Sequence, residues 1–77
     1  MASKYIRTKD NQIIVFSEAM KHSEFKSFNP ISAGFVAFYT GAKGDPDVVC
    51  SGQSFSLNLK PLPDDTDLAR QQLLTLF

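Results

Sequence analysis

The chain has 77 residues, 43% of them hydrophobic, and its eight basic and eight acidic residues give a formal net charge of zero. We expect residues 1–77 to form a single small domain, one that buries only about 60% of the surface of its unfolded chain. Zero net charge disfavours a nonspecific nucleic-acid binder and an acidic nucleic-acid mimic, because both depend on a strong long-range field. The single cysteine, Cys50, excludes an intramolecular disulfide.

The apolar segments are too short for a membrane span. The longest nearly apolar run, residues 33–39, is far from the roughly 20 residues that a spanning helix needs. Residues 1–4 lead into no apolar region of the signal-peptide type. We therefore expect a soluble, cytoplasmic protein without a membrane partner.

The first third of the chain predicts a β-hairpin. Residues 4–9 and 12–16 are β-prone, and Asp10 and Asn11 between them tolerate the positive φ angles of a tight turn. From Ser17 to Pro30 the alternation is lost. We expect a loop there, with one or two helical turns that Ser17 caps and that Asn29–Pro30 ends, although the pattern leaves open whether residues 17–30 are helical.

Three further β-prone runs follow and predict a meander. Residues 31–40 are the most hydrophobic run and should form the central strand. Turn-forming residues occupy 41–46, and a second run covers 47–51. Gly52–Gln53 suits a two-residue turn into residues 55–60, where Phe55, Leu57 and Leu59 alternate with polar residues.

The C-terminal segment predicts a helix. Asp64 or Asp65 should cap it, and Leu73 lies in the middle of its apolar stripe. The stripe consists of Ala69, Leu73, Leu76 and Phe77. The predicted fold is α+β: an antiparallel sheet of about five strands, made of a hairpin plus a three-stranded meander, with the helix packed on the face of residues 55–59. The position of the hairpin in the sheet is left open.

Five short segments carry a resemblance to known proteins: KYIRT at 4–8, HS at 22–23, ISAGF at 31–35, GQSFSL at 52–57 and PDDTD at 63–67. Together they resemble small phage- and prophage-encoded proteins of uncharacterised function. The resemblance implies a phage accessory protein in the host-cell cytoplasm, of a class that often binds a host or phage macromolecule. It supplies no catalytic residues.

Cys50 and His22 are the one pair that could act as nucleophile and base. Cys50 lies inside a β-prone run, where cysteine usually behaves as a small buried hydrophobe. His22 lies in the irregular segment, where we expect a surface or capping residue. We therefore predict no catalytic residues and no enzyme activity.

Five aspartates raise the question of a cation site, because hard metal ions take carboxylate oxygens. Their spacing lacks the glycine and the final glutamate of a calcium loop. Helix capping and turn formation account for all of them, so we predict no metal site and no cofactor. The five are Asp45, Asp47, Asp64, Asp65 and Asp67.

Residues 34–39 compare with the aromatic strand of RNA-recognition sheets, on which bases stack. The match is partial, because Ala33 stands where that motif has a basic residue and the order of elements differs. Core packing of Phe35, Val36 and Phe38 is the preferred interpretation. Phe35, Phe38 and Tyr39 are the candidate interaction surface.

The leading hypothesis is a noncatalytic phage or prophage accessory protein that acts by protein–protein interaction, one version being inhibition of a host defence or regulatory protein. The alternatives are weak single-stranded nucleic-acid binding through the central strand and a small Cys/His enzyme. We also expect a homodimer, because one short helix covers only part of an open sheet. A monomer in which residues 17–30 cover the open face is the alternative.

Overall fold

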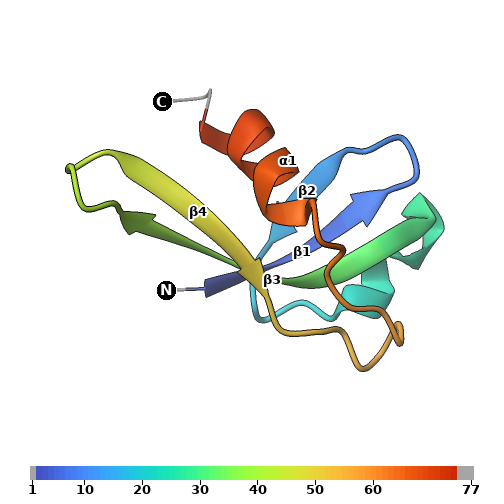
Figure 1. The fold of residues 1–77 in the computed structure, drawn as a ribbon. Helices are drawn as coiled ribbons and strands as arrows, with labels where there is room; N and C mark the ends of the chain where they lie inside the picture. The colour runs from blue at the N-terminus through green and yellow to red at the C-terminus, as the bar shows by residue number, and fades with distance from the viewer. Residues whose placement is uncertain (1, 75–77) are drawn as a thin grey trace.

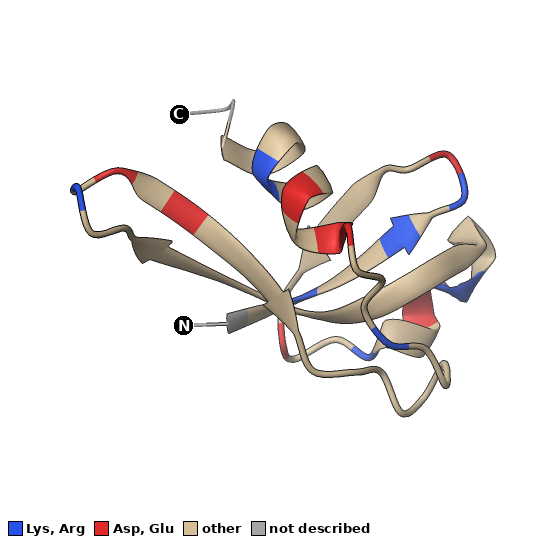
Figure 2. Cartoon of the chain, viewed as in Figure 1, with Lys and Arg blue, Asp and Glu red and all other residues tan. Residues whose placement is uncertain are grey.

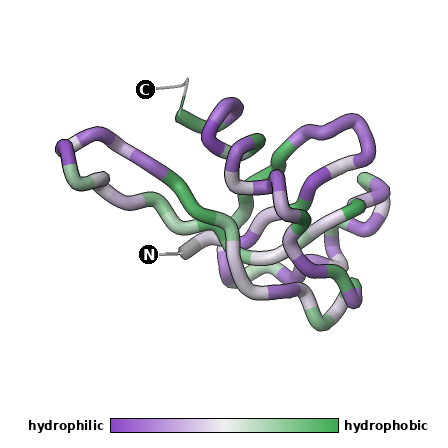
Figure 3. The backbone as a smooth tube through the Cα atoms, viewed as in Figure 1, coloured by the Kyte–Doolittle hydropathy of each residue, from purple (hydrophilic) through white to green (hydrophobic). Residues whose placement is uncertain are grey.

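The computed structural model describes residues 2–74, and its elements combine one sheet, one 3-10 helix and one α-helix. In chain order they are β1 (Ala2–Thr8), β2 (Ile13–Phe16), η1 (His22–Phe28), β3 (Pro30–Thr40), β4 (Pro46–Ser51) and α1 (Asp65–Leu73). The molecule measures 37 × 25 × 20 Å. It is elongated because the far ends of β3 and β4 extend as an arm beyond the other strands (Figure 1), and most of the turn at the end of this arm is hydrophilic (Figure 3).

The sheet is antiparallel with the strand order β2-β1-β3-β4, which confirms the α+β architecture. Tyr5 in β1 pairs with Val15 on one side and with Gly34 on the other. The first hairpin therefore joins the sheet through β1, and β1 and β3 are the two interior strands. The hairpin turn is as predicted: Asn11 has a φ of 62°, and its N–H donates to the Thr8 carbonyl at 2.9 Å.

The prediction of a fifth strand at residues 55–60 is wrong, because the sheet has four strands. Residues 55–58 form turns, with a single β-bridge between Ser54 and Leu59. The chain leaves the sheet at Gly52, whose φ is 75°, and turns again at Asn58, whose φ is 55°. Phe55, Leu57 and Leu59 thus belong to a compact turn, in which Leu57 and Leu59 point toward the protein interior.

Residues 17–30 contain a helix, but a later one than predicted. Ser17 accepts a hydrogen bond from the Ala19 N–H at 3.1 Å, which makes a turn and caps no helix. The 3-10 helix η1 begins at His22. Asn29, with a φ of 54°, ends it immediately before Pro30, as predicted.

Two apolar clusters lie on opposite faces of the sheet. The helix-side core consists of Tyr5, Ile13, Val36, Val48 and Ala69. The loop-side core consists of Ile6, Phe16 and Ala33, against which Phe25, Leu57 and Leu59 pack. Alternate residues of each strand supply the two clusters, as the pleat requires.

The helix α1 packs on the face of the sheet opposite to the one predicted. It lies against β4, and its Ala69 is fully buried in the helix-side core. Leu57 and Leu59 belong to the loop-side core instead. Leu73, expected at the centre, is half-buried at the margin of the helix-side core. Leu76 and Phe77 of the predicted stripe lie outside the described residues.

The start of α1 is tied to β1 by a buried polar network. Asp65 is fully buried, and its carboxylate accepts from the Tyr5 hydroxyl at 2.5 Å and from Arg7 Nη1 at 2.9 Å. Arg7 Nη1 also donates to Asp64 at 2.7 Å. Asp64 occupies the N-cap position, as predicted, but its side chain makes no capping hydrogen bond. Both carboxylates bind a guanidinium that the fold buries.

Ionisation in this network follows from burial and pairing. Burial, together with the hydrogen bond to Asp65, raises the pKa of Tyr5 above its ordinary value. The hydrogen bonds to Asp64 and Asp65 raise the pKa of Arg7, and the Arg7 guanidinium lowers the pKa of Asp64. The phenol therefore stays neutral and the guanidinium stays charged at neutral pH.

Both edge strands have outward N–H groups that are already bonded. On β4, the Val48 N–H donates to the Asp47 carboxylate at 2.7 Å and the Cys50 N–H donates to Thr66 Oγ1 at 3.0 Å. On β2, the Ile13 N–H donates to Gln72 Oε1 at 2.8 Å. These bonds reduce the capacity of the edges to pair with another strand.

We predict that Asp65→Ala lowers the free energy of unfolding by about 3–5 kcal/mol, because it leaves the Tyr5 hydroxyl unpaired and the buried Arg7 short of a partner. Urea unfolding followed by circular dichroism measures the change. Asp67→Ala is the matched control: its 74% exposed side chain pairs with Arg70, and its loss should cost less than about 1 kcal/mol. Equal losses in the two variants would contradict the assignment.

Candidate functional site

The three aromatic residues proposed as an interaction surface do not share one face of the sheet. Val36 lies in the helix-side core, so by alternation Phe38 points to that side while Phe35 and Tyr39 point to the other. Phe38 is 40% exposed and Tyr39 is 47% exposed, whereas Phe35 is half-buried. Core packing is confirmed for Val36 and is wrong for Phe38.

Phe55 is the aromatic residue that the sequence reasoning missed. Its side chain is 86% exposed, the highest fraction among the large hydrophobic residues of the described chain. The turn beneath it is ordered by hydrogen bonds: Ser54 and Leu59 exchange N–H···O bonds of 2.8 and 3.1 Å, and the Leu57 N–H donates to Ser54 Oγ at 3.2 Å. The structure therefore presents a large ring to solvent on a backbone that is already fixed.

The signal for this turn was present in the sequence. Ser54, Ser56 and Asn58 are all residues that favour turns, and they fall at alternate positions of the predicted strand and its start. The same positions satisfy a polar-out alternation, which is why the segment was interpreted as a strand. Turn composition was the more informative pattern.

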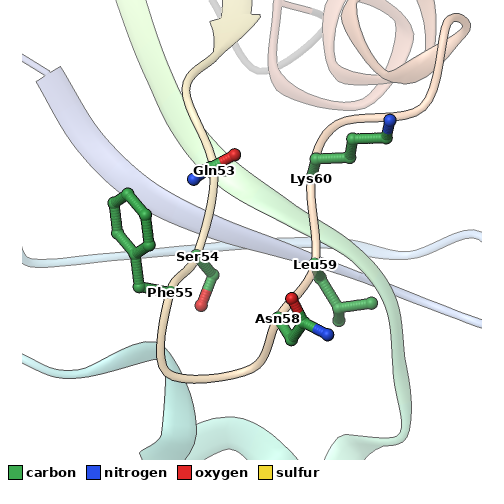
Figure 4. Close-up of a pocket in the computed structure, with 6 residues that line it drawn as sticks. All are labelled: Gln53, Ser54, Phe55, Asn58, Leu59 and Lys60. Carbon is green, nitrogen blue, oxygen red and sulfur yellow. The ribbon is translucent and has the colours of Figure 1, made fainter.

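Two hollows flank the Phe55 ring. The first, of about 290 Å³, is the turn hollow; its lining residues are Gln53, Ser54, Phe55, Asn58, Leu59 and Lys60. Figure 4 shows the Phe55 ring on the side of this turn away from Leu59. The second, of about 270 Å³, is the lysine hollow; its lining residues are Lys4, Lys21, His22, Phe35, Gln53, Phe55 and Ser56. We call Phe55 and these two hollows the Phe55 ridge.

His22 forms a fixed part of the lysine hollow, and it is not the surface or capping residue that was expected. Its side chain is buried, and its Nε2 donates to the Gly34 carbonyl at 2.8 Å. The ring packs edge-on against Phe16 and Phe35, with centroid distances of 5.5 and 5.8 Å. The imidazole therefore packs against the Phe35 ring from inside the protein.

Among the described residues, the charged side chains that line the two hollows of the Phe55 ridge are all lysines. Lys4, Lys21 and Lys60 line the hollows, and no Asp or Glu of the described residues does so. The two arginines are held in ion pairs at the other side of the sheet: Arg7 binds Asp64 and Asp65, and Arg70 binds Asp47 and Asp67. Acidic residues lie on β4 and at the start of α1, and others lie in the first hairpin turn, before η1 and in η1 (Figure 2). A chain of zero net charge therefore has a locally cationic surface.

Cys50 and His22 are not brought together. Cys50 packs against the helix-side core, and its backbone N–H is bonded to Thr66 of α1. His22 packs beside Phe16 and Phe35 on the opposite face. Burial raises the pKa of the Cys50 thiol, which disfavours the thiolate that a nucleophile requires.

Four of the five aspartates considered as cation ligands, Asp47, Asp64, Asp65 and Asp67, have other side-chain partners. Asp64 and Asp65 bind Arg7, while Asp47 accepts from Arg70 Nε at 2.8 Å and from the Tyr39 hydroxyl at 2.9 Å. These contacts and the Val48 N–H lower the pKa of Asp47 to about 2. Among residues 2–74, no group of three or more His, Cys, Asp or Glu side chains is arranged to hold a metal ion.

Comparisons of this chain with protein-family models, with curated protein sequences and with solved structures find no match. Within the described part of the chain, no helix has both the length and the apolar character needed to cross a membrane.

We predict that the Cys50 thiol of the native protein reacts with a chromogenic disulfide reagent at neutral pH at least about tenfold more slowly than in urea, because burial disfavours its thiolate. Stopped-flow absorbance gives both rates, and Cys50→Ala supplies the blank. Equal rates in the native and unfolded protein would indicate an exposed thiolate and would restore the enzyme hypothesis.

Proposed function

We propose that this protein is a noncatalytic binding module that engages a protein partner through the Phe55 ridge. The observation that carries the proposal is the 86% exposed Phe55 ring on a hydrogen-bonded turn. An exposed ring of this kind contributes little to the stability of the free chain. It contributes to binding when a partner covers it.

The energetics favour a role as an interface anchor. Moving a phenylalanine side chain from water into a protein contact is worth about 1.5–3 kcal/mol. Because the turn is already fixed, little backbone entropy is lost on association. Aromatic anchors surrounded by polar rims are typical of the central residues of protein interfaces.

The biological setting that we propose comes from the resemblance of the sequence to phage- and prophage-encoded proteins. In that setting the chain acts in the cytoplasm of the host cell. Its partner is a host defence or regulatory protein, which binding modulates or inhibits.

Single-stranded nucleic-acid binding is the second candidate function. The observation that favours it is the presence of three lysines beside an exposed aromatic ring. Against this candidate, Phe35 and Tyr39 lie on one face of the sheet and Phe38 lies on the other. The β3 strand therefore has no continuous row of aromatic rings on which successive bases could stack. Affinity for an oligonucleotide that falls steeply with salt would support this candidate.

We predict that Phe55→Ser weakens partner binding at least about tenfold, because it removes the central apolar contact. Random peptides displayed on yeast and enriched on the folded wild-type protein provide the ligands, and fluorescence anisotropy gives each affinity. Phe38→Ser is the matched control, since Phe38 is an exposed phenylalanine on the other face of the sheet. Both variants are first checked for a native circular dichroism spectrum. Selected peptides that bind Phe55→Ser as tightly as the wild type would refute the proposal.

We also propose that the chain forms a two-fold dimer through the exposed apolar side of the β3–β4 arm, where Tyr39 is 47% exposed and Val49 is 40% exposed. Zero net charge leaves no long-range repulsion between copies. We predict a sedimenting mass of twice the 8.5 kDa chain mass at micromolar concentration, and a monomer for Val49→Lys. A single wild-type species near 8.5 kDa would refute the dimer.

A further inference from the structure

We propose that the lysine hollow accepts one large apolar side chain of the partner together with a carboxylate next to it in the partner sequence. This inference rests on the proposed function and specifies the chemistry of the segment that the Phe55 ridge binds. It is carried by the apolar lining of the hollow, by its size and by the sign of the charge at its rim.

Two aromatic side chains, Phe35 and Phe55, and the His22 imidazole contribute to the lining of the hollow. Phe35 is half-buried and His22 is buried, with its imidazole held by the Gly34 carbonyl at 2.8 Å. Phe55 forms the exposed wall. A partner side chain that enters between Phe35 and Phe55 exchanges water for two aromatic surfaces without requiring the backbone to move.

The size of the hollow limits the occupant. Its volume of about 270 Å³ is below the roughly 300–1,000 Å³ that is typical of sites for drug-sized molecules and cofactors. One aliphatic or aromatic side chain suits this space better than a complete cofactor does. The occupant is therefore part of a larger molecule that also contacts the surrounding surface.

The rim supplies two cations. The Lys4 ammonium donates one hydrogen bond to the Met20 carbonyl at 2.8 Å, which holds the group in place and leaves two further N–H donors. Lys21 is exposed at the start of η1, and the nearby Glu24 carboxylate is bonded to the Lys21 backbone N–H at 2.7 Å. The described residues contribute no acidic side chain to the lining. A partner carboxylate would thus meet two ammonium groups that have no ion-pair partner among residues 2–74.

A carboxylate in a protein fits this arrangement better than the phosphate of a nucleic acid. Nucleic-acid grooves track several phosphates along a cationic path, whereas here Lys4 and Lys21 lie at one open hollow. The edges of a base also need several hydrogen-bond partners, and besides the lysines only Gln53 and Ser56 of the lining have side chains that are exposed to offer them. The ligand chemistry is therefore an acidic and apolar peptide segment.

The test is a titration of ¹⁵N-labelled protein with two blocked pentapeptides, followed by amide chemical shifts. The acidic probe is acetyl-Gly-Asp-Phe-Glu-Gly-amide, and the basic probe has Lys in place of both acids. We expect the acidic probe to shift the amides of Lys21, Gln53 and Phe55 and to bind at least about fivefold more tightly than the basic probe. Lys21→Glu should abolish this preference. Lys43→Glu, in the exposed turn between β3 and β4, should preserve it.

Each other outcome overturns the inference. If the two probes bind with equal affinity and Phe55→Ser abolishes this binding, the inference of a carboxylate is refuted and the proposed function stays intact. Absence of shifts at the hollow with the acidic probe would refute the site. Displacement of the probe by oligothymidine at lower concentration would assign the hollow to nucleic acid. Shifts of the same amides on raising protein concentration alone would assign it to a second copy of the chain.

The proposed function fails in a separate experiment. It is refuted if display-selected peptides bind Phe55→Ser as tightly as the wild type.

Discussion

The buried contact between Arg7 and Asp65 is the constraint on which the rest of this structure depends. It takes a charged guanidinium and a carboxylate out of water on the same face of a small sheet, and their pairing, with the further bonds of Arg7 to Asp64, offsets the lost hydration. The Tyr5 hydroxyl and the Leu62 backbone N–H also donate to the Asp65 carboxylate. The first turn of α1 is thereby held against β1, and Ala69 is placed over the helix-side core.

That constraint also accounts for the position of Phe55. The chain leaves β4 at Ser51 and must return to Asp65 on the face that α1 covers. On the way it passes close over β3 at Gly34, where a Cβ atom would lie 2.6 Å from the Ser51 carbonyl oxygen and 3.0 Å from a Pro61 carbon. Leu57 and Leu59 point toward the loop-side core. Phe55, at the outside of the turn, has no such contact, so its exposure follows from the path of the connection.

Local features of the fold were predictable from the sequence, whereas long-range partnerships were not. The Asp10–Asn11 hairpin and the end of η1 at Asn29 depend on φ preferences within a few residues, which the sequence displays directly. The alternation at residues 55–60 fits both a strand and a turn with inward leucines, and it outweighed the turn-forming residues Ser54, Ser56 and Asn58 in the prediction. The roles of Asp65 and His22 depend on Arg7 and Gly34, partners that are distant in the chain. No periodic pattern in the sequence indicates these long-range contacts. The candidate site, which is built around Phe55, was therefore missed.

The distance along the chain between Arg7 and Asp65 also governs how the protein is made. The two residues are 58 positions apart, so β1 and β2 can pair early in synthesis while the Arg7 guanidinium still has neither aspartate. Until residues 64–69 leave the ribosome, the face that becomes the helix-side core stays in water. Folding of the helix-side core is then completed when residues 64–69 dock on β1, and contacts between residues so far apart in the chain are associated with slow folding. A chain in which residues 64–69 have not yet docked exposes the apolar face of the sheet and an unpaired Arg7, and such exposed surface is what chaperones and proteases recognise.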